Sequence, residues 1–239
     1  MGRGVNLLLF TDSDRPEVGH IRVTDRRLKH LNEVLKSKPG DRVAVGEIGG
    51  QTGSGEILQI NSEAALLATQ LDTSPPPKLP LSLVLAMPRP KMLRRILRTI
   101  AESGVGRLHL INSYRVEKSY WQTPLLKESM LRDYLCQGLE QARDTVLPPV
   151  TIHRQFKPFV EDLLPAMTRE RLSLLAHPGN HLPCPRGVTD ETLLVIGPEG
   201  GFIPYEVDKL QQAGCQAVSL GPRILRVENA VSNLLGRLF

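Results

Sequence analysis

The chain of 239 residues has three cysteines and no long hydrophobic run. Cys136, Cys184 and Cys215 are odd in number and widely spaced, which argues against a disulfide framework or a structural zinc site. No apolar stretch approaches the roughly 20 residues that span a bilayer. The segment Met1–Phe10 is too short for a signal peptide. We therefore expect a cytoplasmic protein with no membrane partner.

Several familiar catalytic patterns are also missing. The sequence has no Gly-x-Ser-x-Gly elbow and no Gly-Lys-Ser/Thr, which argues against hydrolases and P-loop proteins. His177, His181 and Cys184 have a spacing that suits a metal, but a loop rich in Pro and Gly holds a tetrahedral site imprecisely, so we expect no metal. Aromatic residues make up only 4%, and no stacking platform for single-stranded RNA is evident, although Tyr114, Tyr120 and Trp121 share one segment.

Positive charge is in excess, with 30 basic against 25 acidic residues and a net charge of +5. The excess suits an anionic partner. One basic cluster lies at 22–29 and another at 89–98. Each cluster alone is equally well read as a solvated surface, but the two together favour nucleic acid. The predicted RNA-binding residues from these clusters are Arg22, Arg26, Arg27, Arg89, Lys91, Arg94, Arg95 and Arg98.

A Pro-rich segment divides the chain, because four prolines fall within 75–80 and stiffen the backbone. We predict a small β-rich domain over residues 1–73, a linker over 74–80 and a second domain over 81–239. The first domain is expected to contain one helix at Arg26–Lys36 and a flexible hairpin loop at Gly49–Gly55. Its predicted strands are Val5–Phe10, Asp41–Glu47, Gly55–Ile60 and Ala64–Leu71.

After the linker, strands alternate with helices, which predicts an α/β domain with a parallel sheet covered by helices on both faces. The predicted strands are Leu81–Ala86, Arg107–Asn112, Val150–Gln155, Leu172–His177, Leu193–Gly197 and Ala217–Leu220. The predicted helices are Lys91–Ser103, Leu125–Ala142, Phe159–Met167, Tyr205–Ala213 and Val227–Leu238. The first of these helices pairs a basic face with an apolar stripe of Leu93, Ile96, Leu97, Ile100 and Ala101.

Two glycine loops follow predicted strands near the C-terminus. The run LLVIGPEGGF at 193–202 ends a strand in a loop whose glycines permit positive φ and close approach of a ligand. Alone, this pattern is equally typical of a tight turn. The run SLGPRILRVENA at 219–230 also places a Gly-Pro pair directly after a predicted strand. Two such loops at neighbouring strand ends predict one shared binding pocket.

These segments closely resemble the signatures of the 16S ribosomal RNA uracil-N3-methyltransferase family within the SPOUT superfamily. The likeness extends over nearly the whole chain, including PRPKMLRRILRTIAESGV at 88–105, SYRVEKS at 113–119 and LEQARDTVLPPV at 139–150. It implies a PUA-like N-terminal β-barrel, a C-terminal SPOUT domain with a trefoil knot, and a homodimer. It also adds Arg115 to the RNA-binding residues.

The resemblance implies that S-adenosylmethionine is bound by three loops, with backbone groups making most contacts. The implied cofactor-binding residues are Leu175, Ala176, His177, Ile196, Gly197, Pro198, Glu199, Gly200, Gly201, Leu220, Gly221, Ile224, Leu225 and Arg226. Arg226 is the leading catalytic candidate, as a cation that stabilises negative charge on the uracil carbonyls. Glu228 is a candidate base, although a carboxylate in the first turn of a helix also serves as a cap.

Some readings stay open. Glu199 is an alternative base, and Asn229 stands where the family usually has threonine, so the role of that side chain is open. The main expectation is methylation of N3 of a uridine in small-subunit ribosomal RNA. A non-catalytic ribosome-assembly factor and a transfer RNA methyltransferase are the alternatives. A factor without a cofactor is free to lose the residues of the glycine loops. The enzyme is favoured because four of them are retained, namely Gly197, Gly200, Gly201 and Arg226.

Overall fold

The computed structural model describes residues 7–239. The first two residues of the predicted strand Val5–Phe10 therefore lie outside the described residues. The chain forms two compact units. One comprises the residues up to Pro77 together with Leu135–Leu147, and the other comprises Lys78–Tyr134 together with Pro148–Phe239. The contribution of 135–147 to the first unit is not evident from the sequence, because it depends on contacts between segments far apart in the chain.

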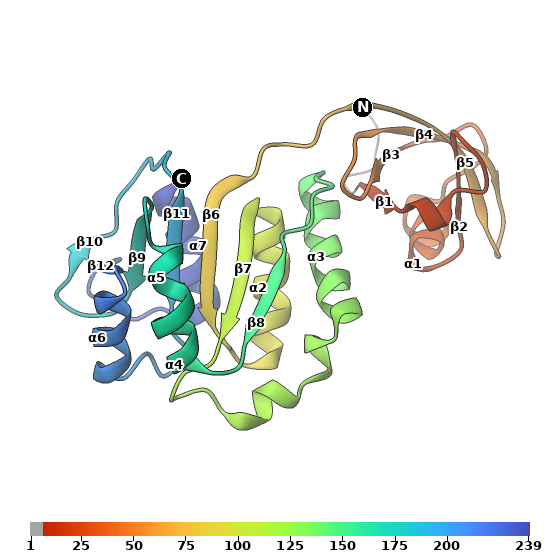
Figure 1. Cartoon of the computed structure of the whole chain (residues 1–239). Coiled ribbons are helices and arrows are strands. Elements are labelled where there is room, and N and C mark those ends of the chain that lie inside the picture. The colour runs from red at the N-terminus through yellow and green to blue at the C-terminus, as the bar shows by residue number, and fades with distance from the viewer. Residues whose placement is uncertain (1–6) are drawn as a thin grey trace. The chain divides into compact units, whose positions relative to one another are not determined.

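The first unit is a curled five-stranded sheet (Figure 1). Its strands are β1 (Leu8–Phe10), β2 (His20–Val23), β3 (Arg42–Glu47), β4 (Thr52–Ile60) and β5 (Ala65–Thr73). Their order is β1-β3-β4-β5-β2. The pair β1 and β3 is parallel, and the other pairs are antiparallel. The architecture is barrel-like, with an apolar interior.

Alternating side chains of these strands fill that interior. The fully buried members include Phe10, Ile21, Val45, Ile57 and Leu67. Strand β2 was not predicted, because four residues give too short an alternation to recognise. The predicted loop at 49–55 is wrong in its second half, which belongs to β4. Gly53 explains this, since a Cβ there would lie 1.9 Å from the carbonyl oxygen of Gln70 on β5. That glycine serves close strand pairing and not loop flexibility.

The predicted helix of this unit is confirmed, in a modified form. A short helix α1 (Arg26–Lys29) continues as a π-helical turn over His30–Leu35. Asp25 caps the start by accepting a hydrogen bond from the backbone N–H of Arg27. The helix ends at Lys36, which has a φ of 52°. Leu28 and Leu31 join the interior and fix this helix against the sheet.

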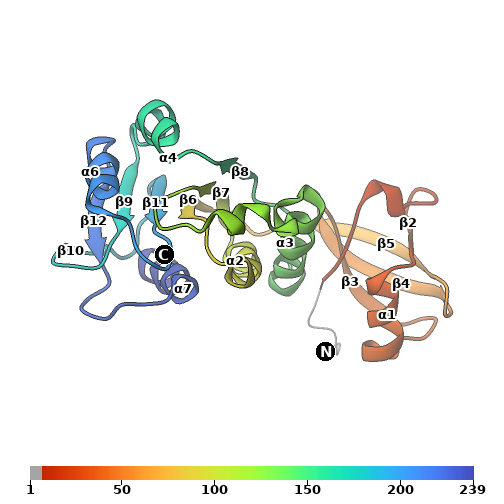
Figure 2. The same cartoon turned by 90° about the horizontal axis from the view of Figure 1, so that it is seen from below.

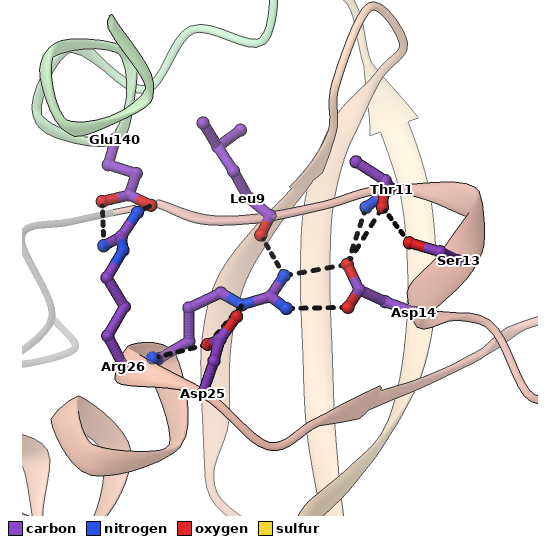
Figure 3. Close-up of polar contacts among 8 residues, drawn as sticks. Leu9, Thr11, Ser13, Asp14, Asp25, Arg26 and Glu140 are labelled. Carbon is purple, nitrogen blue, oxygen red and sulfur yellow. Dashed lines mark hydrogen bonds and ion pairs between the residues drawn. The ribbon is translucent and has the colours of Figure 1, made fainter. Parts of the chain in front are cut away.

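Arg27 is the centre of a polar network that reaches β1, and Figure 3 labels its partners Leu9, Asp14 and Asp25. Its guanidinium donates two hydrogen bonds to the carboxylate of Asp14, at 2.9 and 2.7 Å, and one to the carbonyl oxygen of Leu9 at 2.8 Å. Its Nε donates to Asp25 at 2.9 Å. Burial by itself raises the pKa of Asp14, but the hydrogen bonds from Arg27 and Thr11 outweigh it, so the pKa lies below 3.8.

Arg26 forms a second bridge in the same unit (Figure 3). Its guanidinium donates two hydrogen bonds to the carboxylate of Glu140, at 2.9 and 2.6 Å. Glu140 also contributes its carbonyl oxygen to the backbone N–H of Leu7. The carboxylate is only 10% exposed. This bidentate pair therefore attaches the end of helix α3 to the β-rich unit.

The second unit contains a seven-stranded, fully parallel sheet. Its strands run in the order β10-β12-β9-β11-β6-β7-β8. Their bounds are β6 (Leu79–Ala86), β7 (Val105–Ile111), β8 (Val150–His153), β9 (Leu172–Ala176), β10 (Leu182–Pro183), β11 (Thr192–Ile196) and β12 (Gln216–Ser219). The six longer strands confirm the predicted parallel sheet, and the two-residue β10 was not predicted.

Helices cover both faces of this sheet, as predicted (Figure 2). Helices α2 (Pro90–Glu102) and α7 (Val227–Leu238) lie on one face. On the other face lie α6 (Pro204–Gln212) and a helical segment made of α4 (Phe156–Pro158), a π-helical turn (Phe159–Leu163) and α5 (Leu164–Met167). The predicted apolar stripe of α2 is confirmed, since all five of its residues are buried.

Helix α3 (Glu128–Ala142) begins later than the predicted Leu125. Short 3₁₀ turns at Lys118–Gln122 and Pro124–Leu126 precede it. Lys127 marks the delay, because it is extended at ψ 137° and separates the second turn from α3. In residues 7–239, no helix is both long enough and apolar enough to cross a membrane.

Replacing Arg27 with Gln should lower the free energy of unfolding by about 3 kcal/mol, because the Asp14 carboxylate would remain largely buried without its cation. The matched control is Arg42→Gln. Arg42 pairs with Glu56 at 3.4 Å, with side chains 71% and 44% exposed, and its loss should change stability by less than about 0.5 kcal/mol. Urea denaturation followed by circular dichroism measures both. Equal losses in the two variants would contradict a structural role for Arg27.

Candidate functional site

Three loops meet at the carboxyl edge of the parallel sheet. They leave β9, β11 and β12, and β9 lies between the other two strands. Ala176 at the end of β9 pairs with Ile196 of β11 and with Val218 of β12. Parallel strands in register end at the same level, so the loops that follow them converge. The sequence prediction of converging glycine loops is thereby confirmed.

The loops enclose a pocket of about 260 Å³. Helix α7 closes one side of it through Val227, Ala230 and Leu234. Twelve of the predicted cofactor-binding residues line the pocket, namely Ala176, His177, Ile196, Gly197, Pro198, Glu199, Gly200, Gly201, Leu220, Gly221, Ile224 and Leu225. The lining also includes residues that sequence reasoning missed, among them Pro178, Phe202, Ser219 and Arg223. All four are next to predicted residues, so a wider window around each glycine loop would have found them.

Two predicted cofactor residues do not line the pocket. Leu175 lies inside β9, paired with Val195 and Ala217, and its side chain is fully buried. Arg226 precedes α7 as its N-cap residue and is exposed outside the lining. Leu175 therefore supports the pocket from behind, and Arg226 stands beside it. Glu228, in the first turn of α7, is likewise outside the lining.

Glycine is required at particular points of these loops. Gly201 and Gly221 have φ of 70° and 116°, in the region that other residues avoid. At Gly197, a Cβ would approach the Phe202 ring to 3.1 Å and the Phe202 backbone nitrogen to 3.3 Å. The loop after β11 therefore folds back tightly on Phe202. A side chain at Gly197 would push Phe202, which lines the pocket, out of place.

Two hydrogen bonds connect the loop after β11 with the segments that follow β6 and β7. The carboxylate of Glu199 accepts a hydrogen bond from the backbone N–H of Arg89 at 2.9 Å. The guanidinium of Arg115 donates to the carbonyl oxygen of Gly200. Arg115, predicted to bind RNA, thus has a structural contact with the pocket loop. The Glu199 carboxylate is already engaged, which weakens its reading as a base.

The loop after β7 is fixed to α6 by a buried carboxylate. Glu206 is 3% exposed. Its two carboxylate oxygens accept hydrogen bonds from the backbone N–H of Tyr114 at 2.7 Å and from that of Ile203 at 3.1 Å. Glu206 therefore joins the loop over 112–121 to the helix that follows the glycine loop. No pattern in the sequence singles it out.

The predicted RNA-binding residues fall into different environments. Arg22 on β2 is exposed, as are Lys91, Arg94 and Arg95 on α2. The guanidinium carbons of Arg94 and Arg98 lie 6.0 and 4.8 Å from the centre of the Tyr134 ring. Arg27 has a structural role in this unit, because its guanidinium donates to Asp14, Asp25 and Leu9. Arg26 is likewise paired, with Glu140.

The His177, His181 and Cys184 segment shows packing contacts. The rings of His177 and His181 are 5.5 Å apart in an edge-to-face arrangement, and Cys184 is buried. Within residues 7–239 no group of three or more His, Cys, Asp or Glu side chains is arranged to hold a metal ion.

Comparison with known proteins assigns the class. Residues 75–238 match the family model described as an RNA methyltransferase domain. The chain is 32% identical to the ribosomal RNA small subunit methyltransferase E of Treponema pallidum over 240 residues, covering 95% of this chain and 87% of the relative. It is 27% identical to the protein of that name from Synechocystis, covering 91% of this chain and 72% of the relative.

Solved structures share the fold. A ribosomal RNA small subunit methyltransferase E from Neisseria gonorrhoeae, bound to S-adenosyl methionine, superposes with a TM-score of 0.75 at 20% identity, covering 96% of this chain and 95% of that chain. A methyltransferase from Legionella pneumophila, in complex with the cofactor SAM, superposes with a TM-score of 0.72 at 20% identity. The superposition again covers 96% of this chain and 95% of that chain.

The fold and the glycine-loop pocket thus define an RNA methyltransferase domain in the parallel-sheet unit. The chain belongs to the ribosomal RNA small subunit methyltransferase E family.

Replacing Glu206 with Ala should destabilise the second unit by about 1–3 kcal/mol, because the N–H groups of Tyr114 and Ile203 would lose their acceptor. Amide hydrogen exchange should become faster at Tyr114 in particular. Glu206→Gln keeps an acceptor oxygen and is the matched control, with a smaller loss. Exchange at Tyr114 that is unchanged in Glu206→Ala would show that the carboxylate does not hold this loop.

Proposed function

We propose that this chain uses S-adenosylmethionine to methylate N3 of a uridine in 16S ribosomal RNA of the small ribosomal subunit, in the cytoplasm. The carrying observation is the convergence of three loops, from β9, β11 and β12, on one pocket in a chain of this family. Relatives that bear the name of small-subunit methyltransferases support the substrate class. The uridine and its N3 atom come from the resemblance of the glycine loops to the uracil-N3-methyltransferase signatures.

The residues present fit the cofactor. Ile196, Gly197, Leu220 and Leu225 line the pocket, and their main-chain N–H and C=O groups are the proposed partners of the adenine and ribose. Gly197 lets the loop after β11 pack closely on Phe202, where a Cβ would come within 3.1 Å of the ring. Charged lining residues of both signs, Glu199 and Arg223, suit a ligand that carries both an ammonium and a carboxylate. When bound, S-adenosylmethionine supplies an electrophilic methyl group on a positively charged sulfur.

Arg226 is the proposed catalytic cation. A uridine N3 must lose its proton to attack the methyl group, and until the N–C bond forms the negative charge is shared with the two flanking carbonyl oxygens. Arg226 is exposed beside the pocket at the start of α7. None of the hydrogen bonds or ion pairs within residues 7–239 engages its side chain, so the guanidinium is available to those oxygens. Glu228, in the first turn of α7, is the proposed proton acceptor.

RNA contact is proposed for both units. The exposed cations of α2, Lys91, Arg94 and Arg95, are suited to phosphate groups, and Arg22 is suited to extend the contact to the first unit. The curled sheet of that unit supports a PUA-like RNA-binding domain over residues 1–73, joined by 74–80 to a methyltransferase domain over 81–239.

A trefoil knot in the C-terminal segment is also proposed. After β12 at one side of the sheet, the chain returns to pack α7 against α2 and β11 near the middle. Such a return around the glycine loops is the geometry that a knot needs. A crystal structure in which residues 217–239 pass through a preceding loop would support the knot, and one in which they pass outside every loop would refute it.

Labelled methyl should pass from S-adenosylmethionine to small ribosomal subunits that lack their own N3-methyluridine, and appear in N3-methyluridine after digestion. Arg226→Ala should slow transfer by roughly 10²–10³-fold, the effect of losing one group that stabilises developing charge. Cofactor affinity by calorimetry should change little, since Arg226 lies outside the pocket lining. Arg186→Ala, at another exposed arginine, is the matched control and should keep full activity.

Gly197→Val tests the cofactor site in the same assay, and it should abolish both cofactor binding and transfer. Cofactor binding without transfer to small subunits would redirect the proposal to another RNA, such as transfer RNA. Absence of cofactor binding by the unaltered chain would refute the enzyme and leave a ribosome-assembly factor.

We also propose that the chain forms a homodimer through the loop between β12 and α7, part of which lines the glycine-loop pocket. Ile224 is 83% exposed and Leu220 is 39% exposed, although both are apolar. A second copy of the chain would cover them. Sedimentation equilibrium at micromolar concentration should give twice the chain mass of 26.5 kDa. A mass of one chain at that concentration would refute the dimer.

A further inference from the structure

A second pocket opens in the parallel-sheet unit, with a volume of about 400 Å³. Its walls come from three separate segments: the loop after β7, the start of α4 and the start of α6. It shares no lining residue with the glycine-loop pocket. The two pockets are nonetheless neighbours, because Phe156 of one and Phe202 of the other have ring centres 6.3 Å apart. A ligand that spans adjacent sites would reach both.

Aromatic residues are concentrated at this pocket. The whole chain has one Trp, four Tyr and five Phe. The Trp, two of the Tyr and one Phe line this single pocket, namely Trp121, Tyr114, Tyr205 and Phe156. Tyr114 is 79% exposed and Tyr205 is 49% exposed. Exposed aromatic rings beside a pocket are the usual surface on which nucleic-acid bases stack.

The pocket is also positively charged. Lys118 and Lys157 lie in its lining and are exposed. The guanidinium of Arg154 stands 5.4 Å from the centre of the Trp121 ring. Lys157 has only a loose contact with Glu161, at 3.9 Å. The one acidic lining residue, Glu206, is buried and engaged with backbone N–H groups. The accessible charge therefore suits a phosphate.

The walls are held in place before any ligand arrives. The indole N–H of Trp121 donates to the side-chain oxygen of Asn112 at 2.9 Å. The backbone of Tyr114 is anchored on Glu206 at 2.7 Å. Preformed walls lower the entropy cost of binding.

One polar atom of the wall lacks a partner. Ser113 is 4% exposed, and its hydroxyl oxygen is buried with no hydrogen bond in the part of the chain described, residues 7–239. Buried polar atoms are normally satisfied, so this hydroxyl is suited to bond a ligand. A nucleobase offers both carbonyl acceptors and N–H donors, and a hydroxyl can pair with either.

We propose that this pocket binds one unpaired nucleotide of the RNA substrate, next to the nucleotide that enters the glycine-loop pocket. Its base stacks on the ring of Tyr114 or Tyr205 and bonds Ser113, and its phosphate lies near Lys118 and Lys157. The inference rests on the proposed function for the identity of the substrate. It adds a specificity site that selects RNA in which the bases around the target are unstacked.

The chain's single Trp gives a direct readout of binding. A uridine tetranucleotide added to the cofactor-loaded chain should quench Trp121 fluorescence to saturation, and inorganic phosphate should not. Tyr114→Ala should weaken the binding roughly 5- to 150-fold, the range for losing one base stack, while Tyr114→Phe keeps the ring and the affinity. Lys118→Ala should also weaken binding. Its matched control, Lys127→Ala, changes an exposed lysine outside the lining and should have no effect.

Methyl-transfer kinetics separate this inference from the proposed function. In the Tyr114→Ala chain, KM for RNA should rise, with cofactor affinity unchanged. Two results would refute nucleotide binding at this pocket and leave the methyltransferase function intact. One is an active chain whose Trp121 fluorescence does not respond to the tetranucleotide, and the other is an equal KM for RNA in Tyr114→Ala and Tyr114→Phe. Equal quenching by phosphate alone would mean an anion site and would also refute nucleotide binding. A saturating, Tyr114-dependent response in a chain that transfers no methyl would support the pocket and refute the proposed reaction.

Discussion

The parallel register of β9, β11 and β12 is the constraint on which the site depends. Because Ala176, Ile196 and Val218 lie side by side, the three strands end at the same level of the sheet. The loops that follow them therefore occupy the same space. The glycines then decide what that space becomes. Gly197 packs closely on Phe202, and Gly201 and Gly221 adopt positive φ, so the loops can turn tightly around the pocket. A slip of one strand would move a loop out of the pocket and leave a parallel sheet without a cofactor site.

Around this edge, charged side chains act mainly by holding loops. Glu199 engages the backbone of Arg89, Arg115 engages Gly200, and Glu206 engages Tyr114. Each contact connects the end of one strand or loop with the next. Together they place the aromatic pocket beside the glycine-loop pocket. These polar contacts thus fix the geometry of this edge, whereas the exposed cations Lys118, Lys157 and Arg226 take no part in them.

The same division between structural and available charge holds in the first unit. Arg26 and Arg27 belong to one basic cluster in the sequence, yet both guanidinium groups are bound to carboxylates in the fold. Arg22, four residues earlier, projects from β2 into solvent. Charge counting along the chain cannot separate these cases, because Asp14 and Glu140 come from distant positions. A basic cluster is therefore evidence for an anionic partner only after its internal ion pairs are known.

The sequence by itself determined the parallel α/β sheet, the buried stripe of α2 and the two glycine loops. The sheet and the stripe follow from local periodicity, and the loops follow from glycines at positions whose backbone geometry other residues avoid. The sequence also carried the family signature. The tertiary structure decided which residues face a pocket: it removed Leu175, added Phe202 and Arg223, and gathered Tyr114, Trp121 and Tyr205 from segments that look unrelated along the chain. It also turned part of the loop at 49–55 into strand, through the close approach of Gly53 to β5. The reason is physical, because contacts between distant segments depend on register and packing, which the local pattern of residues does not encode.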